Sequence, residues 1–158
     1  MTSRRILASA AAIGALGVAG WIGISAAMAT GGAGILPYDD PEAVGRGAQI
    51  YQENCAACHG AQLEGQANWR ERGADGLMPA PPHDRTGHTW HHADTLLFRI
   101  TKYGSEAVIG NGYRSAMIGF GDVLSDADIL DVLAYIKSTW PDEVIGIHDQ
   151  INEDAARQ

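Results

Sequence analysis

The sequence predicts an all-α fold in which a few helices are joined by long loops. Three segments have the apolar spacing and the end signals of helices, and no stretch shows the alternation of apolar and polar residues that is typical of a strand. Glycine accounts for 20 of 158 residues, whereas aromatic residues are few. We therefore expect long connections that wrap around a central group.

The first predicted helix spans residues 41–57. Asp40 is a suitable N-cap, and Pro41 fits the first helical position, where no backbone donor is needed. The expected apolar face consists of Val44, Ala48 and Tyr51. Gly45 and Gly47 lower the helix propensity, and a close helix–helix contact would offset that cost.

Two further helices are predicted. One spans residues 94–103 and ends at Gly104. The other begins after Ser125, which forms a near capping box with Asp128, and stops before Pro141. Its expected buried stripe consists of Ile129, Val132, Leu133 and Ile136. The segments without a period are predicted loops: residues 60–82 and 104–123.

The N-terminus has the pattern of an export segment. Arg4 and Arg5 precede an uncharged run over residues 6–29, which ends in a small-x-small site. A basic start, an apolar stretch and such a site describe a secretory signal. The run is also long enough to span a bilayer, although it is rich in alanine and glycine. Residues 1–29 are therefore interpreted as either a signal peptide or an N-terminal membrane anchor.

Both interpretations send the rest of the chain across the membrane, to the periplasmic side of the bacterial inner membrane. That part divides into a flexible linker over residues 30–37, one domain over residues 38–141 and an acidic, frayed tail over residues 142–158. The formal charge of −8 leaves no basic patch, so no nucleic-acid partner is expected.

One short motif carries the chemistry: Cys55-Ala56-Ala57-Cys58-His59. The two thiols lie on one side of a helical turn, so each can form a thioether to one vinyl group of a haem. His59 then directs an imidazole nitrogen at the iron from the same side. We expect one covalently bound haem c, with Cys55 and Cys58 as thioether donors and His59 as an axial ligand.

A redox dithiol and half of a zinc site are the alternatives for this motif. The chain has only two cysteines, so a zinc site would need an unusual set of histidines. A thioredoxin-like dithiol needs a βαβ context, which this helical sequence does not offer. Two cysteines are also too few for the disulfide framework of a small secreted domain.

A methionine is the expected sixth ligand, and two candidates follow the motif: Met78 and Met117. Met117 lies in the glycine-rich loop 110–120, immediately before the last predicted domain helix. A loop that far along the chain can fold over the opposite haem face, so we favour Met117. The alternative is a loop methionine that only fills the core.

The chain from about residue 41 to residue 140 resembles the monohaem class I cytochromes c, especially the bacterial cbb3-type subunit III cytochromes. Residues 47–60, Gly-Ala-Gln-Ile-Tyr-Gln-Glu-Asn-Cys-Ala-Ala-Cys-His-Gly, are similar to the first helix of that family. Residues 120–126, Phe-Gly-Asp-Val-Leu-Ser-Asp, lead into a segment that is similar to its last helix.

The resemblance implies the class I cytochrome c fold around one haem, with His59 and Met117 as axial ligands. It also implies that the first and last helices cross, with Gly47 and Tyr51 against Tyr135. A proline carbonyl, from Pro81 or Pro82, would orient the proximal histidine. The family usually has proline after the ligand methionine, where this sequence has Ile118.

Four histidines lie within ten residues: His83, His88, His91 and His92. Imidazoles suit a transition metal, and His88 and His92 have the i, i+4 spacing of a facing pair. Clustering alone is a weak signal. The simpler interpretation is a loop that lines the haem, in which the histidine and Trp90 nitrogens form hydrogen bonds with propionates or backbone.

These observations predict an electron-transfer protein rather than an enzyme. Its redox partners would be a membrane oxidase, a bc1-type complex or a dehydrogenase, and residues 6–29 would offer a possible membrane tether. A haem enzyme or gas sensor with an open iron is the alternative if Met117 is not a ligand. A metal-handling module that uses the histidine cluster is the third hypothesis.

Overall fold

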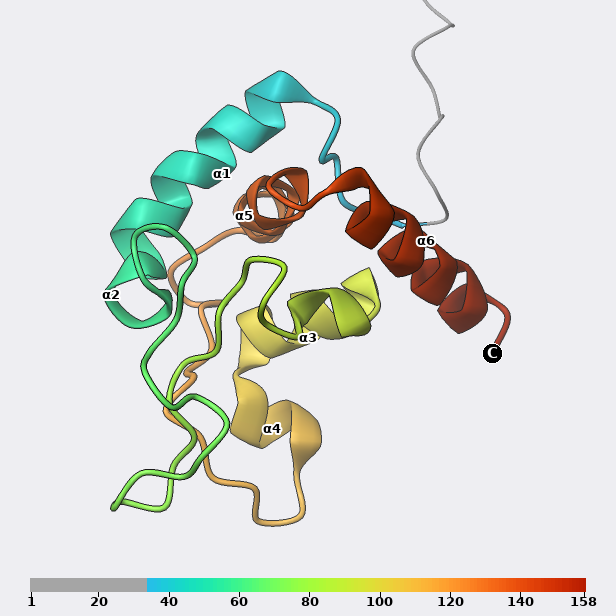
Figure 1. Ribbon diagram of the computed structural model, residues 1–158. Coiled ribbons are helices and arrows are strands. Elements are labelled where there is room, and N and C mark those ends of the chain that lie inside the picture. Colours follow the sequence, from blue (N-terminus) through green and yellow to red (C-terminus); the bar gives the residue numbers. More distant parts are fainter. Residues whose placement is uncertain (1–33) are drawn as a thin grey trace, which may run out of the picture. The chain divides into compact units, whose positions relative to one another are not determined.

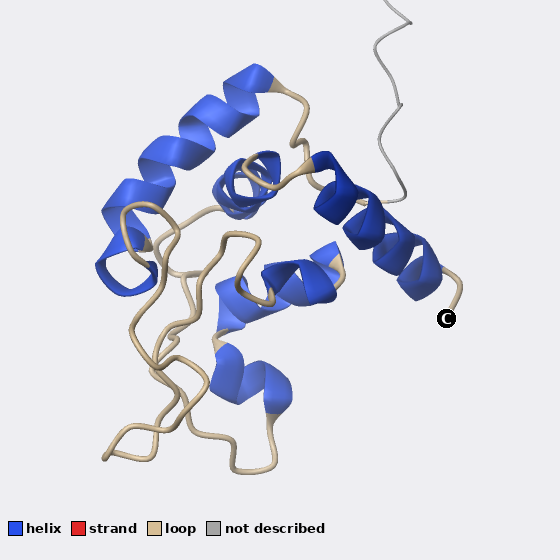
Figure 2. Ribbon diagram, in the orientation of Figure 1, coloured by secondary structure: helices blue, strands red, loops and turns tan. Residues whose placement is uncertain are grey.

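The computed structural model describes residues 34–158, and the predicted signal or anchor over residues 1–29 lies outside this part of the chain. The elements are α1 (Pro41–Asn54), α2 (Ala56–His59), the 3-10 turn η1 (Thr89–His91), α3 (Asp94–Tyr103), α4 (Ser105–Ile109), α5 (Asp126–Ser138) and α6 (Asp142–Ala156). No strand occurs between residues 34 and 158, and long loops join the helices (Figure 2). The predicted all-α class is confirmed.

Helix α1 begins as the sequence predicts and ends earlier. The Asp40 carboxylate accepts a hydrogen bond from the Glu42 backbone N–H at 2.9 Å. The helix stops at Asn54 instead of residue 57, because Cys55 turns the chain into the separate short helix α2. Gly60, with a φ of 81°, then ends α2 and turns the backbone into the loop.

The core of the domain is built where α1 packs across α5, which Figure 1 shows nearly end-on beside α1. The most buried face of α1 consists of Ala43, Gly47 and Tyr51, one position away from the predicted stripe at its start. Gly47 lies against the α5 backbone at Asp131, and the rings of Tyr51 and Tyr135 are 5.5 Å apart. The crossing that the resemblance implied is confirmed.

Helix α5 has the predicted start and the predicted buried stripe. The Ser125 side chain accepts a hydrogen bond from the Asp128 N–H, and the Asp128 carboxylate accepts one from the Ser125 N–H, which completes a capping box. The four stripe residues, Ile129, Val132, Leu133 and Ile136, are all buried. They form the centre of the apolar core.

The frayed tail predicted over residues 142–158 is wrong, because most of this segment forms helix α6. His148 and Asn152 are buried, and Lys137 of α5 pairs with Asp149 at 2.5 Å. The buried face of this segment therefore contains polar residues. Packing against α5 and the loop before α3 stabilises this helix. Its acidic composition had instead suggested an exposed tail.

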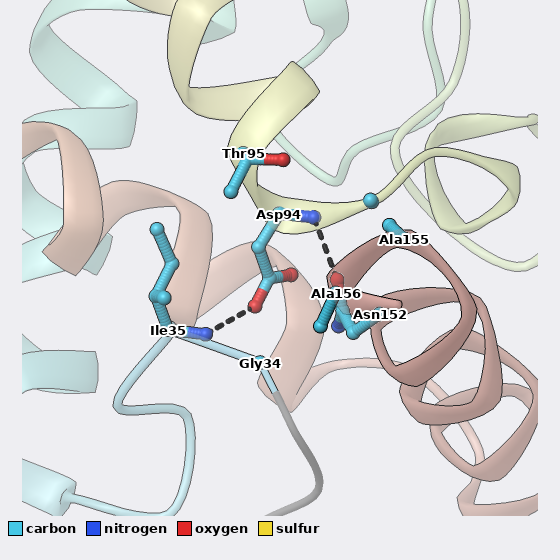
Figure 3. Close-up of a pocket in the computed structure, with 8 residues that line it drawn as sticks. Gly34, Ile35, Asp94, Thr95, Asn152, Ala155 and Ala156 are labelled. Atoms are coloured by element: carbon cyan, nitrogen blue, oxygen red, sulfur yellow. Dashed lines mark hydrogen bonds between the residues drawn. The ribbon is translucent and has the colours of Figure 1, made fainter. Parts of the chain in front are cut away.

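The end of the predicted linker is attached to the domain. The Asp94 carboxylate accepts hydrogen bonds from the backbone N–H groups of Ile35 at 2.7 Å and Leu36 at 3.3 Å, and Leu36 is buried. Asn152 of α6 accepts a hydrogen bond from the Asp94 N–H at 2.8 Å. Figure 3 shows Asp94 between Ile35 and Asn152. Residues 34–36 are therefore not a free linker.

Helix α3 matches its predicted bounds and ends at Gly104, which has a φ of 84°. The loop predicted over residues 104–123 contains one short helix, α4, that the sequence analysis did not find. The rest of this loop is held to the end of α3. Phe120 N–H donates to the Thr101 carbonyl at 2.9 Å, and Gly121 N–H donates to the Lys102 carbonyl at 3.0 Å.

Candidate haem site

The attachment motif occupies one turn at the end of the first helical segment. The backbone N–H groups of Cys58 and His59 donate to the Cys55 carbonyl at 3.1 and 2.9 Å. Tyr51, at the core of the α1–α5 crossing, donates from its hydroxyl to the Gly60 carbonyl at 2.8 Å. The packing of α1 therefore fixes the turn that carries both thiols and the imidazole.

The His59 side chain has the arrangement of an oriented metal ligand. It is buried, and its Nδ1 lies 2.8 Å from the Pro81 carbonyl oxygen. Because a carbonyl only accepts, Nδ1 carries the proton and Nε2 keeps its lone pair for a metal. Desolvation lowers the pKa of His59, and the Pro81 hydrogen bond opposes this effect only in part. Of the two prolines that the resemblance offered, Pro81 supplies the carbonyl.

The segment Pro81–His83, which we call the proximal strap, holds this imidazole in place. The His83 ring stacks on the His59 ring with a centroid distance of 4.0 Å and an interplanar angle of 23°. The His83 N–H donates to the Leu63 carbonyl at 2.8 Å, and its Nδ1 lies 2.8 Å from the Thr89 hydroxyl. The strap therefore contacts His59 through both a hydrogen bond and a stacked ring.

Cys55 does not have the properties of the reactive thiol of a redox dithiol. Cys55 is half-buried and Cys58 is exposed. Burial, and to a lesser degree the neighbouring Cys58, raises the pKa of Cys55 to about 11. A catalytic dithiol needs a thiol that ionises readily, and the Cys55 thiol stays protonated at neutral pH. A pair of thiols beside a buried neutral imidazole fits covalent haem attachment instead.

The two candidate methionines lie in different parts of the domain. Met117 is half-buried in the loop after α4, where its carbonyl accepts from the Ser105 N–H at 3.2 Å and its N–H donates to the Ser115 hydroxyl at 3.0 Å. Met78 is also half-buried, and it lies three residues before Pro81 in the segment that leads into the proximal strap.

The cytochrome c family matches residues 44–140, which is more than half of the chain. The chain belongs to the cytochrome c family. It is accordingly an electron-transfer protein that binds haem c covalently, and the spacing of Cys55 and Cys58 is that of the family's attachment motif. The predicted fold, cofactor and general function are confirmed.

One curated relative of this cytochrome is the cbb3-type cytochrome c oxidase subunit FixP of Azorhizobium caulinodans. The two are 27% identical over 92 residues, which are 58% of this chain and 28% of the relative. The matched region therefore spans little more than a quarter of the relative's length. No solved structure gives a significant match. No helix between residues 34 and 158 is long and apolar enough to cross a membrane.

The rings of three histidines in the cluster of this cytochrome pack against aromatic neighbours. The His88 ring stacks on Trp69 at 5.2 Å and meets the His92 ring edge-on at 5.5 Å, while His91 packs against Trp90 at 3.8 Å. The part of the chain that the structure describes contains no group of three or more His, Cys, Asp or Glu residues placed to hold a metal ion. The third hypothesis, a metal-handling module, has no structural support.

Sequence reasoning missed the residues that support the proximal strap from behind. The Trp140 indole N–H donates to the His83 carbonyl at 2.7 Å, across 57 positions of the chain. Trp140 is 4% exposed, so this hydrogen bond is shielded from water. Neither residue is close to the other in sequence, and no local pattern pairs them.

Proposed function

We propose that this cytochrome carries a single haem, attached to Cys55 and Cys58 and ligated by His59 and Met117, and that it transfers one electron at a time. The observation that carries the proposal is the buried His59 imidazole, whose Nδ1–H is assigned by the Pro81 carbonyl at 2.8 Å. This contact leaves Nε2 as the donor atom, beside the two thiols of the same turn. It is the arrangement that a covalently attached haem requires.

When bound, the haem supplies a one-electron couple between ferrous and ferric iron. The protein's part is to keep the ligand geometry the same in both states. The Pro81 carbonyl and the His83 ring fix the plane of the His59 imidazole. Burial of His59 would exclude water from that side of a bound haem iron. Such a site binds no substrate and makes no bond, so we propose a carrier rather than an enzyme in its own right.

The placement of the two methionines supports Met117 as the distal ligand. Met78 precedes Pro81 by three residues, and the strap that follows it contacts the imidazole on the proximal side. Met117 belongs to a loop that is anchored elsewhere, at the junction of α3 and α4. A ligand opposite His59 has to come from an element that is not part of the proximal side, and the Met117 loop meets this requirement.

The test is a matched pair of variants, Met117→Ala and Met78→Ala, in the haem-loaded protein. We expect Met117→Ala to remove the weak near-infrared sulfur-to-iron band and to open the ferrous iron to carbon monoxide, because the sixth position loses its ligand. Met78→Ala should keep both properties of the native protein. The opposite behaviour would make Met78 the ligand, and carbon monoxide binding by the native protein would support an enzyme or gas sensor.

The covalent attachment has its own test. After denaturation in acidified organic solvent, we expect the haem colour to stay with the protein, because the thioethers to Cys55 and Cys58 survive this treatment. Cys55→Ala or Cys58→Ala should leave at most one thioether and reduce the yield of mature protein. Complete extraction of the haem into the solvent would refute the attachment.

We further propose that the domain works on the periplasmic side of a bacterial inner membrane and exchanges electrons with a respiratory complex. Residues 1–29 have the pattern of a signal or an anchor. The relative from Azorhizobium caulinodans is a subunit of a cbb3-type oxidase, which makes a membrane oxidase our first candidate partner. A bc1-type complex or a dehydrogenase would fit the same chemistry.

A further inference from the structure

We infer that Trp140 is a positioning residue for the proximal histidine, acting through the backbone of the proximal strap. The inference rests on the proposed role of His59 as an axial ligand. The strap supplies the carbonyl of Pro81 to His59, and two residues later the carbonyl of His83 accepts the hydrogen bond of the Trp140 indole. The position of the Pro81 carbonyl therefore depends on how firmly the His83 carbonyl is held.

The strap is an irregular loop that belongs to no helix of residues 34–158, so contacts with other segments hold it in place. Its neighbour Gly65 is packed so closely that a β-carbon there would lie 2.6 Å from the Pro81 carbonyl carbon. Beyond the stacking on His59, His83 is held by the Leu63 carbonyl at its N–H, the Thr89 hydroxyl at its ring and Trp140 at its carbonyl. The Trp140 hydrogen bond, at 2.7 Å, is the one that joins the strap to the turn between α5 and α6.

Trp140 is itself a rigid support. Its backbone N–H donates to the Lys137 carbonyl at 3.1 Å, and its ring meets the His148 ring of α6 edge-on, with centroids 5.1 Å apart and an interplanar angle of 82°. His148 is fully buried, and its Nε2 lies 3.0 Å from the His92 carbonyl. Helix α6, which follows the region matched by the family, thus contacts the ring of Trp140 through His148.

The chemical consequence follows from the hydrogen bond of the ligand. When Nδ1–H donates strongly to a carbonyl, Nε2 becomes more basic and stabilises the ferric state over the ferrous state. If the strap relaxes, the bond between His59 and Pro81 weakens, and the reduction potential rises. Trp140 therefore keeps the potential lower than an unsupported strap would.

The experiment compares Trp140→Phe with Trp90→Phe in the full-length, haem-loaded protein. Both changes remove an indole N–H that donates to a loop carbonyl, since Trp90 donates to the Arg85 carbonyl at 3.3 Å. We expect Trp140→Phe to raise the reduction potential and to accelerate solvent exchange of the hyperfine-shifted His59 Nδ1–H in proton NMR, by up to about tenfold for the weakening of one hydrogen bond. Trp90→Phe should change neither.

Thr89→Val is a second variant that keeps the core volume and removes another support of the strap. It should shift both readouts in the same direction as Trp140→Phe, and it carries the test if Trp140→Phe does not mature. Lower unfolding stability with an unchanged potential and unchanged Nδ1–H exchange would overturn the inference. A native spectrum without the signature of an axial histidine would instead refute the proposed ligation itself, so the two failures are distinguishable.

Discussion

Gly47 of α1 lies directly against the backbone of Asp131 in α5. A β-carbon at residue 47 would be 2.6 Å from the Asp131 carbonyl carbon and 2.9 Å from Cβ of Tyr135. Neither neighbour can move without displacing α5, because one is backbone and the other is the stem of a packed side chain. The closest approach of the two helices therefore depends on the absence of a side chain at this position.

Gly47→Ala should consequently destabilise the protein by about 1–3 kcal/mol, the usual cost of forcing an extra carbon into a packed contact. Gly45→Ala is the matched control, because a β-carbon at residue 45 meets no atom within 4 Å. There the better helix propensity of alanine should stabilise the protein by about 0.5–1 kcal/mol. Urea unfolding, followed by helical circular dichroism, measures both. Equal effects of the two substitutions would contradict the close contact.

The elements that the sequence predicted well are those whose signals are local. The Ser125 and Asp128 pair lies within one helical turn, and both of its hydrogen bonds form. The Asp40 cap of α1 and the end of α3 at Gly104 were also predicted, because each depends only on neighbouring residues. Cys55, Cys58 and His59 also share one turn, so the core of the haem site was visible in the sequence.

Helix α6 was missed because its buried face is polar. Val144, His148 and Asn152 follow the i, i+4 spacing of a helix face, and this spacing was available in the sequence. Their composition suggested solvent exposure, however. The partners of His148 and Asn152 are His92 and Asp94, which precede them by 56 and 58 positions. Pairs separated by more than fifty residues leave no local pattern, and the Trp140–His83 hydrogen bond is of the same kind.

Lys137 provides a test of how strongly α6 is attached. Its side chain is 1% exposed, and its ammonium pairs with Asp149 at 2.5 Å and lies 4.3 Å from the centre of the Tyr38 ring. Asp149→Asn should cost about 3 kcal/mol of unfolding free energy, because it leaves a buried charge without its partner. Denaturant unfolding of the haem-loaded protein measures the loss.

The control for Asp149→Asn is Asp154→Asn, on the same helix. The Asp154 side chain is 58% exposed, pairs with the exposed Arg157 and accepts a hydrogen bond from the Gln150 amide at 3.2 Å. Because these contacts lie in solvent, Asp154→Asn should change the free energy of unfolding by no more than about 0.5 kcal/mol. If the two substitutions had equal effects, α6 would be held by something other than the Lys137 pair.

The burial of His148 predicts that the folded protein loses stability in mild acid. Complete burial lowers the pKa of this histidine in the folded state, and the nearby Asp94 carboxylate opposes this effect only in part. Below about pH 6.5, the usual pKa of histidine, the unfolded chain therefore binds a proton that the folded protein does not. The unfolding free energy should fall as the pH drops below 6.5, by up to about 1.4 kcal/mol per pH unit from this residue.

The measurement is denaturant unfolding between pH 7.5 and 5.5 for the native protein, His148→Gln and His91→Gln. His148→Gln should make the pH dependence shallower, since glutamine takes up no proton in this range. His83, His88 and His92, whose pKa values burial also lowers, keep their own share of it. His91 is exposed, and His91→Gln should leave the slope as it is in the native protein. A native protein whose stability does not change across this range would show that His148 is protonated in the fold.

The last prediction concerns the two hydrogen bonds that the Asp94 carboxylate accepts from the backbone of residues 35 and 36, which we call the Asp94 clasp. A shortened chain that begins at Thr30 lacks the signal or anchor and keeps this clasp, so it should fold with native stability and a native spectrum. A chain that begins at Asp39 lacks the clasp. It should lose about 3 kcal/mol, because Leu36 no longer packs in the core and the Asp94 carboxylate loses two hydrogen bonds from backbone N–H groups.

The Thr30 chain also separates the two interpretations of the N-terminus, because its haem domain is unchanged. If residues 6–29 anchor the native protein, tethering holds the domain near a membrane-bound partner at high effective concentration. The Thr30 chain should then exchange electrons with native membranes much more slowly than the full chain does, at equal haem concentration. Equal rates, or native protein whose N-terminus is found near Thr30, would identify the segment as a cleaved signal. In that case the acidic domain would depend on free diffusion, and its electron transfer should slow as salt screens the attraction to a basic partner.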